Sequence, residues 1–354
     1  MSIKRYNPLR FTWHFTFFIL FLSSFWGVGG GVVFSQTPGE WTWMNGNNTN
    51  NPPGVFGTQG VPNAANTPPG LYEPCEWKDN NGNFWLFGGE QNSDVYSALW
   101  KYNPVTNQWT WMKGSFNVNQ TGVYGTQGVP SPANLPGARG FGTTTWTDLA
   151  GNLWLFGGYG FDAVSSVLVQ LNDLWKYDIA INQWTWMKGP NIVNDPGNYG
   201  TKCVPANSNV PPSKTENRAR VRDACGNFWN FGGSGTGAFI NDLWHYNVST
   251  NQWIWVSGDN VPNQATVFGT KGVSNPANKL GAKMGSIAWI DNNGYIWIFG
   301  GLNVGNKYND LFRYVPDPAC VPICNFNINI ISSGILCNGQ CSGTATVTPT
   351  SGTA

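Results

Sequence analysis

The stretch "GNLWLFGGYG", from Gly151 to Gly160, decides the fold because close variants of it recur along the 354-residue chain. Spacings of 69, 75 and 68 residues separate four glycine pairs, which are Gly88-Gly89, Gly157-Gly158, Gly232-Gly233 and Gly300-Gly301. A recurring period of this size indicates a repeat architecture in which each copy is one supersecondary unit.

Four short segments recur in the same order within each repeat. In the second repeat they are "RGFGTTTW", "NLWLFGG", "NDLWKYD" and "QWTWMKG". Each segment is rich in β-branched and aromatic residues and is bounded by turn residues, a pattern that predicts a strand. Tight turns such as "DLAGN" join neighbouring segments. The sequence therefore predicts an all-β chain, a β-propeller of four-stranded blades.

The glycine doublet, the later "LWKY" aromatic pair and the Trp of "NQW" together resemble the kelch repeat. All four copies carry these motifs, from Glu40 to about Asp317. The resemblance implies a kelch-type propeller similar to the central domain of galactose oxidase. These repeats exceed the usual ~50 residues, because an insert such as "GVYGTQGVPSPANLPGAR" follows the fourth segment.

The repeats are incomplete at both ends. The first begins with "EWTWMNG" at Glu40, a fourth-strand segment without its first three, and the last ends at "NDLFRYVPDPA" without a fourth. We expect Glu40–Met44 to pair beside Asp310–Tyr314 and to close a ring of four blades, because this pairing would remove an open sheet edge.

Recurring glycines and tryptophans are expected to be structural. The glycine pairs permit a positive φ and a close backbone approach. Trp109, Trp184 and Trp253 each precede a second tryptophan by two residues, so each pair shares one strand face. Their regular recurrence favours a core between blades over a platform that stacks on sugars.

The N-terminus predicts export. Three basic residues precede an apolar run from Phe11 to Phe34, which predicts a signal peptide over residues 1–35 with cleavage before Gln36. An uncleaved membrane anchor is the alternative. Since three of the 19 basic residues lie in this segment, 16 would remain against 18 acidic ones. We therefore expect a secreted or cell-surface protein without a nucleic-acid partner and without membrane insertion after signal removal.

Seven cysteines in an exported chain favour disulfides over a metal site. Four of them could form two bridges among themselves, namely Cys320, Cys324, Cys337 and Cys341. Cys203 and Cys225 flank the innermost strand of the third repeat. About eight strand residues span roughly 26 Å, whereas a bridge needs Cα atoms within ~7 Å, so no bridge is expected between these two.

Long, variable connections on one face are the predicted binding surface, because loops on a rigid scaffold commonly carry recognition. Their aromatic residues are the ligand-binding candidates: Tyr159, Phe161, Tyr199 and Phe239. Exposed rings suit the recognition of sugar faces or protein surfaces.

The third repeat departs from the others in "TENRARVRDAC". Arg218 and Arg220 could clamp a carboxylate or sulfate near the axis of the ring. Glu76 occupies the Arg220 position in the first repeat, so the alternative is a structural ion-pair network with Glu73, Glu76 and Glu216.

The composition disfavours enzymes that depend on histidine. Copper radical oxidases of the galactose oxidase type need two histidine ligands, and only His245 follows residue 35, at a position that is predicted to be exposed and basic. Glycoside hydrolysis would require loop acids such as Glu90, Asp94 and Asp162 to converge within ~5–10 Å. The "NDLW" aspartates are expected to be hydrogen-bond acceptors in turns, and they are Asp173, Asp242 and Asp310.

Beyond Cys324 the pattern changes, and "CNGQCSGTATV" resembles the opening of the SprB-type repeat of gliding adhesins. Within it, "TATVTPT" predicts a strand. This resemblance implies a fragment of a larger Bacteroidota-like surface protein, exported by a type IX system.

The predicted domains are a signal peptide (1–35), a propeller (36–318) and a linker with the start of an SprB-like repeat (319–354). We expect a non-catalytic binding or adhesion module for a surface glycan or protein, without cofactor or metal. The alternatives are an enzyme that acts on extracellular polysaccharide through the long-loop face, and a structural spacer.

Overall fold

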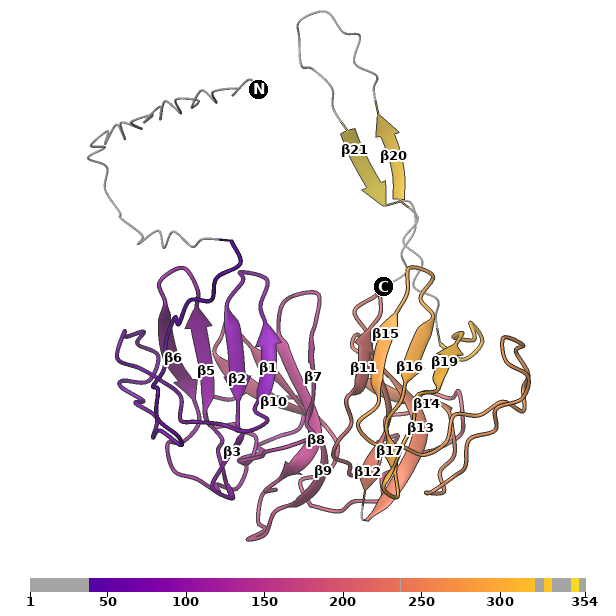
Figure 1. Cartoon of the computed structure of the whole chain (residues 1–354), viewed down its shortest axis with the longest axis horizontal. Coiled ribbons are helices and arrows are strands. Elements are labelled where there is room, and N and C mark those ends of the chain that lie inside the picture. Colours follow the sequence, from indigo (N-terminus) through magenta and orange to yellow (C-terminus); the bar gives the residue numbers. More distant parts are fainter. Residues whose placement is uncertain (1–37, 236, 322–327, 333–344, 350–354) are drawn as a thin grey trace, which may run out of the picture. The chain divides into compact units, whose positions relative to one another are not determined.

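The computed structural model describes residues 38–235, 237–321, 328–332 and 345–349. The chain divides into two compact units, Met1–Trp41 and Thr42–Ala354, and every described strand belongs to the second. Its described residues form strands and no helix (Figure 1), and hence none that could cross a membrane. The predicted signal peptide and the cysteines at 324, 337 and 341 lie outside the described residues.

Three antiparallel sheets have four strands each, in the predicted order along the chain. The first sheet contains β1 (Cys75–Lys78), β2 (Phe84–Phe87), β5 (Leu99–Asn103) and β6 (Gln108–Lys113). The second contains β7 (Thr144–Thr147), β8 (Leu153–Gly160), β9 (Val169–Asp178) and β10 (Gln183–Lys188). The third contains β11 (Ala219–Arg222), β12 (Phe228–Gly235), β13 (Ala238–Asn247) and β14 (Gln252–Ser257).

The fourth sheet has three strands: β15 (Ile287–Ile290), β16 (Ile296–Phe299) and β19 (Leu311–Tyr314). The predicted pairing of Glu40–Met44 with Asp310–Tyr314 is not formed in this structure. Residues 40–44 form no strand, and Trp43 is 68% exposed. Leu311 is exposed as well, and no described strand pairs with the outer edge of β19.

Short hairpins complete the described elements. They are β3 (Glu90–Gln91) with β4 (Asp94–Val95), β17 (Leu302–Asn303) with β18 (Asn306–Lys307), and β20 (Ile328–Ser332) with β21 (Ala345–Pro349). The last of these confirms the strand that was predicted in "TATVTPT".

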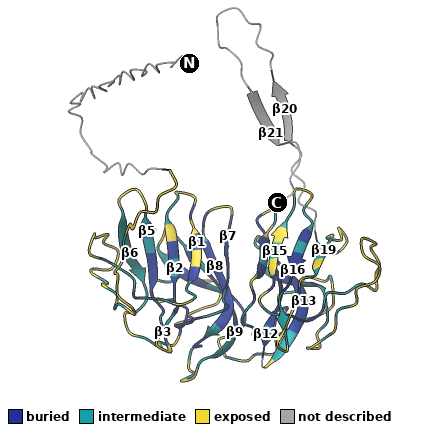
Figure 2. Cartoon of the chain, viewed as in Figure 1, coloured by how far each residue is buried: buried dark blue, intermediate teal, exposed yellow. Residues whose placement is uncertain are grey.

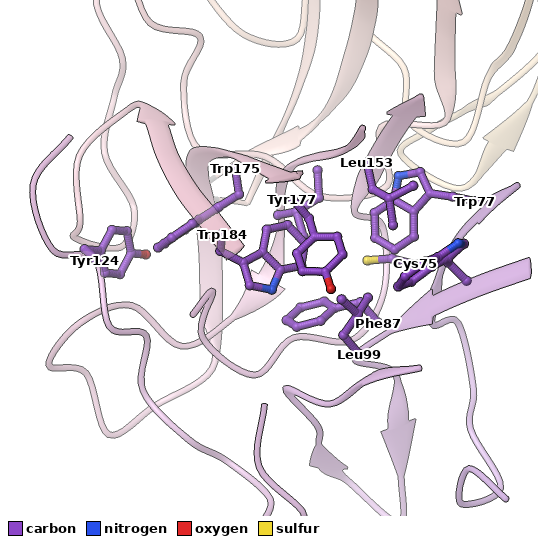
Figure 3. Close-up of a cluster of buried hydrophobic side chains, with 11 residues drawn as sticks. Cys75, Trp77, Phe87, Leu99, Tyr124, Leu153, Trp175, Tyr177 and Trp184 are labelled. Carbon is purple, nitrogen blue, oxygen red and sulfur yellow. The ribbon is translucent and has the colours of Figure 1, made fainter. Parts of the chain in front are cut away.

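Apolar clusters join consecutive sheets. Strand β7 lies against β1 and β11, and β11 lies against β15. Cys75, Trp77 and Phe87 of the first sheet pack against Trp175 and Trp184 of the second (Figure 3). Two similar clusters join the second sheet to the third and the third to the fourth.

The recurring tryptophans build these clusters. Trp184 and Trp253 are fully buried and Trp109 is half-buried, which agrees with the predicted core role. Burial of such rings contributes most of the favourable free energy of packing.

The glycine pairs serve close packing, as predicted. Gly157 has a φ of 61°, and a Cβ there would lie 2.8 Å from the Leu171 carbonyl oxygen and 3.0 Å from that of Lys214. The amide of Gly158 donates to the same Lys214 carbonyl at 3.0 Å. A larger residue would therefore separate the second sheet from the third.

The described residues cover the fourth sheet on one face only. Ile287, Trp289 and Phe299 are exposed on the other face. Figure 2 shows exposed residues along β15. At the matching position of the first sheet Trp77 is 6% exposed, whereas Trp289 is 51% exposed. Phe84 of the first sheet is likewise exposed on the face that points away from the second.

A disulfide joins Cys203, in the insert of the third sheet, to Cys320, which follows β19, with Cα atoms 4.5 Å apart. The prediction that Cys203 does not bridge to Cys225 is confirmed, because Cys203 has this other partner. The prediction of two bridges within the C-terminal group of four cysteines was wrong, since Cys320 pairs with a residue 117 positions earlier. The neighbour in space comes from an adjacent sheet, which spacing in the sequence does not reveal.

Candidate functional site

A cavity of about 450 Å³ opens between the first strands of three sheets. Its lining residues are Lys78, Asp79 and Asn80 from the first sheet, Thr145, Trp146 and Thr147 from the second, and Arg220, Val221 and Arg222 from the third. These residues lie at the end of each strand that leads into a short turn. The cavity is therefore on the short-turn side and not on the long-loop side where binding was predicted.

Asp79 in the cavity wall is a structural residue. Its carboxylate accepts hydrogen bonds from the Trp85 Nε1 at 2.8 Å and from the Asn83 amide at 2.9 Å. Burial alone would raise the pKa of Asp79, but the bonds from Trp85 and Asn83 outweigh it and lower that pKa. The carboxyl group thus stays ionised and holds the turn. Equivalent carboxylates in the other three sheets accept from a tryptophan Nε1, and they belong to Asp148, Asp223 and Asp291.

Three arginines lie at 218, 220 and 222, and the first two form ion pairs with glutamates. Arg220 Nη2 lies 2.7 Å from the Glu76 carboxylate of the first sheet. Arg218 pairs with Glu73 and with Glu216. The structure thus forms the ion-pair network that was the alternative to an anion clamp at these two residues.

Unpaired cations remain at the mouth of the cavity. Arg222 donates to the Thr147 carbonyl oxygen at 2.7 Å and is otherwise exposed. Lys78 is exposed on the neighbouring β1. Within the described part of the chain, no carboxylate lies within 4.0 Å of either side chain's charged group. This mouth can accept a negatively charged group.

The four aromatic ligand candidates do not form one exposed surface. Phe161 is buried against Val95, and the prediction that it is an exposed loop residue was wrong. Tyr199 is also part of the packing, with its ring 5.2 Å from that of Trp244. Tyr159 and Phe239 lie within β8 and β13 and are partly exposed. Strand pairing continues beyond the glycine doublets, and this extension converts the expected loops into sheet.

The "NDLW" aspartates are centres of buried charge and not turn acceptors. Asp173 pairs with Arg139 at 2.8 Å, and both side chains are fully buried. The same carboxylate accepts bonds from the Tyr124 hydroxyl at 2.7 Å and the Trp175 Nε1 at 2.7 Å. Burial raises the pKa of Tyr124 far above its usual value, and the Asp173 charge adds to this, so Tyr124 remains a proton donor.

Similar centres recur in the next two sheets. Asp242 pairs with Lys214 at 2.9 Å, and Asp310 pairs with Lys283 at 2.5 Å. Burial lowers the pKa of Lys214, although Asp242 opposes this shift. The sequence did not reveal these pairs because the basic residue lies about 30 positions before its aspartate, in an irregular connection. Recurrence of a basic residue in that connection was the only available signal.

His245 is buried beside Trp229, with its Nε2 3.4 Å from the Asp223 carboxylate. The prediction of an exposed basic position was wrong, because this strand face is covered by the neighbouring sheet.

The loop acids are engaged in local structure. Asp162 is buried and accepts bonds from the amides of Val164 and Val193. Asp94 accepts from Asn119, and Glu90 accepts from the Ser93 amide. Among the described residues, no three histidine, cysteine or acidic side chains form a group that could hold a metal ion.

No protein-family profile matches the chain, and no curated protein matches it.

Proposed function

We propose that this chain is a secreted or cell-surface, non-catalytic binding module, built as a four-bladed propeller of the kelch type. Four antiparallel sheets whose first strands lie side by side support that architecture. The ion pair between Arg220 of β11 and Glu76 of β1 also supports it, because opposite blades approach each other in so small a ring. A disulfide between Cys203 and Cys320 favours an oxidising compartment.

The ligand that we propose is the negatively charged part of an acidic surface glycan, a carboxylate or a sulfate. The observation that carries this proposal is the cavity mouth, where Lys78 and Arg222 lack carboxylate partners among the described residues. Charge-assisted hydrogen bonds from these two exposed groups stabilise a bound anion by up to about 1 kcal/mol each, because solvent screens them. The walls also offer the hydroxyl groups of Thr145 and Thr147 to sugar hydroxyls.

The test compares binding to an immobilised uronic-acid or sulfated polysaccharide with binding to a neutral one. We expect retention on the acidic polymer and a loss of at least tenfold in affinity in Lys78→Ala/Arg222→Ala. Lys271→Ala/Lys307→Ala is the matched control, because it removes two exposed positive charges away from the cavity. If both double variants lose affinity equally, binding depends on net charge alone. If the wild type binds neither polymer, the glycan proposal fails.

A further inference from the structure

Arg220 lines the same cavity as Lys78 and Arg222, one layer below the mouth. Residues two positions apart on a strand share one face and lie about 7 Å apart along it. Arg220 and Arg222 are related in this way on β11, as are Glu76 and Lys78 on β1. The ion pair between Glu76 and Arg220 therefore forms a layer beneath the two cations of the mouth.

This ion pair is a single contact that solvent reaches. Only the Nη2 atom of Arg220 lies close to Glu76, at 2.7 Å from Oε1. The Glu76 side chain is 71% exposed and that of Arg220 is 26% exposed. Exposed pairs of this kind contribute at most about 1 kcal/mol to stability. Another anion can therefore take the place of Glu76 at little cost.

Two other arginines are held more firmly. Arg139 donates through both Nη atoms to Asp173, and both side chains are fully buried. Arg218 pairs with two carboxylates, those of Glu73 and Glu216. The cavity arginine has neither the burial of the first pair nor the second carboxylate of the other, so it is the one that can change partners.

Glu76 is free to leave Arg220. It does not itself line the cavity, and among the described residues its carboxylate has no second partner. Once Glu76 turns into solvent, three cations line one cavity: Lys78, Arg220 and Arg222. The acid that lines the same cavity, Asp79, is already engaged by Trp85 and Asn83 in its turn.

We infer that Glu76 is a built-in competitor of the ligand, and that a bound anion displaces it from Arg220. This role rests on the proposed function, because it concerns the same cavity and the same anionic glycan. A ligand with one negative group meets Lys78 and Arg222 at the mouth, whereas a second negative group one layer deeper also recruits Arg220. The cavity therefore prefers a glycan with two anionic groups about 7 Å apart, the distance between the layers.

Removing the charge of Glu76 tests this role on an immobilised sulfated polysaccharide. Glu76→Gln keeps the shape of the side chain and should bind about fivefold more tightly than the wild type, because the ligand no longer displaces a carboxylate from Arg220. The gain should disappear in Glu76→Gln/Arg220→Gln. Asp178→Asn is the matched control: it removes one negative charge outside the cavity, at a position where the first and third sheets already have Asn103 and Asn247.

Loss of the competitor role and loss of the proposed function give different results. If Glu76→Gln binds like the wild type while Lys78→Ala/Arg222→Ala binds less, the competitor role is wrong and the proposed function stands. If Asp178→Asn gains as much as Glu76→Gln, or if the gain survives removal of Arg220, net charge explains the effect and the competitor role is wrong. If neither the wild type nor Glu76→Gln binds the polymer, both are wrong.

Side-chain NMR of the protein with Glu76 in place gives an independent measurement. On titration with a short oligosaccharide of the same polymer, the Nε–Hε signals of Arg220 and Arg222 should shift together and saturate together. The Arg218 signal should stay in place, because two carboxylates hold that guanidinium. A shift at Arg222 with none at Arg220 would overturn the displacement of Glu76.

Discussion

The second and fourth sheets are built from nearly the same strands, "NLWLFGG" and "YIWIFGG", and yet they differ in what covers them. Leu174 and Trp146 of the second sheet are buried, whereas the matching Leu311 and Trp289 of the fourth are exposed. The second sheet has a neighbour on each face and an outer strand, whereas the described residues give the fourth sheet one neighbour and no outer strand. Burial in this protein is thus decided by neighbouring sheets and not by the strand motif itself.

The buried aspartate of the second sheet also has more side-chain partners than that of the fourth. Asp173 of the second sheet has three side-chain partners, Arg139, Tyr124 and Trp175. In the fourth sheet phenylalanines, Phe268 and Phe312, stand where the tyrosine and the tryptophan would be, so neither can donate to Asp310.

The largest effect on the free energy of unfolding is expected from the disulfide that links Cys203 to Cys320, just after the fourth sheet. Cys203→Ser/Cys320→Ser should lower the free energy of unfolding by about 4–5 kcal/mol, because the disulfide closes a loop of more than a hundred residues in the unfolded chain. Urea denaturation of the oxidised protein and of the variant measures the difference. An unchanged midpoint and slope would show that the fourth sheet is held by other contacts.

A somewhat smaller loss is expected at the buried aspartates. Asp173→Ala should cost about 3–5 kcal/mol, because it leaves the Arg139 guanidinium buried without a counter-charge. Asp310→Ala should cost less, since Asp310 is partly exposed and lacks the tyrosine and tryptophan donors. Equal losses in the two variants would contradict the contrast between these sheets.

A still smaller, pH-dependent effect on the free energy of unfolding is expected from Cys75, which is buried in the cluster between the first and second sheets. Burial raises the pKa of the Cys75 thiol to about 12, whereas an unfolded cysteine has a pKa near 8.5. The folded state then keeps a proton that the unfolded state loses, so this contribution is present below about pH 8.5 and is lost as pH rises toward 12. Its slope is at most about 1.4 kcal/mol per pH unit. Unfolding free energies at pH 8 and 10 should converge between the wild type and Cys75→Ala, and a constant difference would contradict the assignment.

Strand content and order were predictable from the sequence, because alternation and turn residues act locally. The pairing of Arg220 with Glu76 was also among the predictions, since equivalent positions on opposite repeats can be compared directly. The period of two in a strand separates its faces, but it does not reveal which faces acquire a neighbour. For this reason Phe161 and His245 were expected to be exposed and are buried.

The cavity lies on the side opposite to the long-loop face where binding was predicted, and the sequence did not reveal it for a related reason. Long, variable loops suggested a binding surface. In the structure, however, the Tyr199 ring packs against Trp255 of the outer strand and its hydroxyl donates to Asp242. The open space lies instead between short turns whose sequences are nearly identical. Of the two free cations at that end, Arg222 lies in "TENRARVRDAC", the stretch in which the third repeat departs from the others, whereas Lys78 does not stand out in a single sequence.

The most direct test of the central claim, that neighbouring sheets and not the strand motif decide burial, is the unfolding free energy of Trp146→Ala measured beside that of Trp289→Ala. Both tryptophans occupy the same place in their repeats, but Trp146 is 5% exposed and Trp289 is 51% exposed. Trp146→Ala should cost about 3–5 kcal/mol of unfolding free energy, and Trp289→Ala should cost less than half as much. Similar losses in the two variants would contradict the claim.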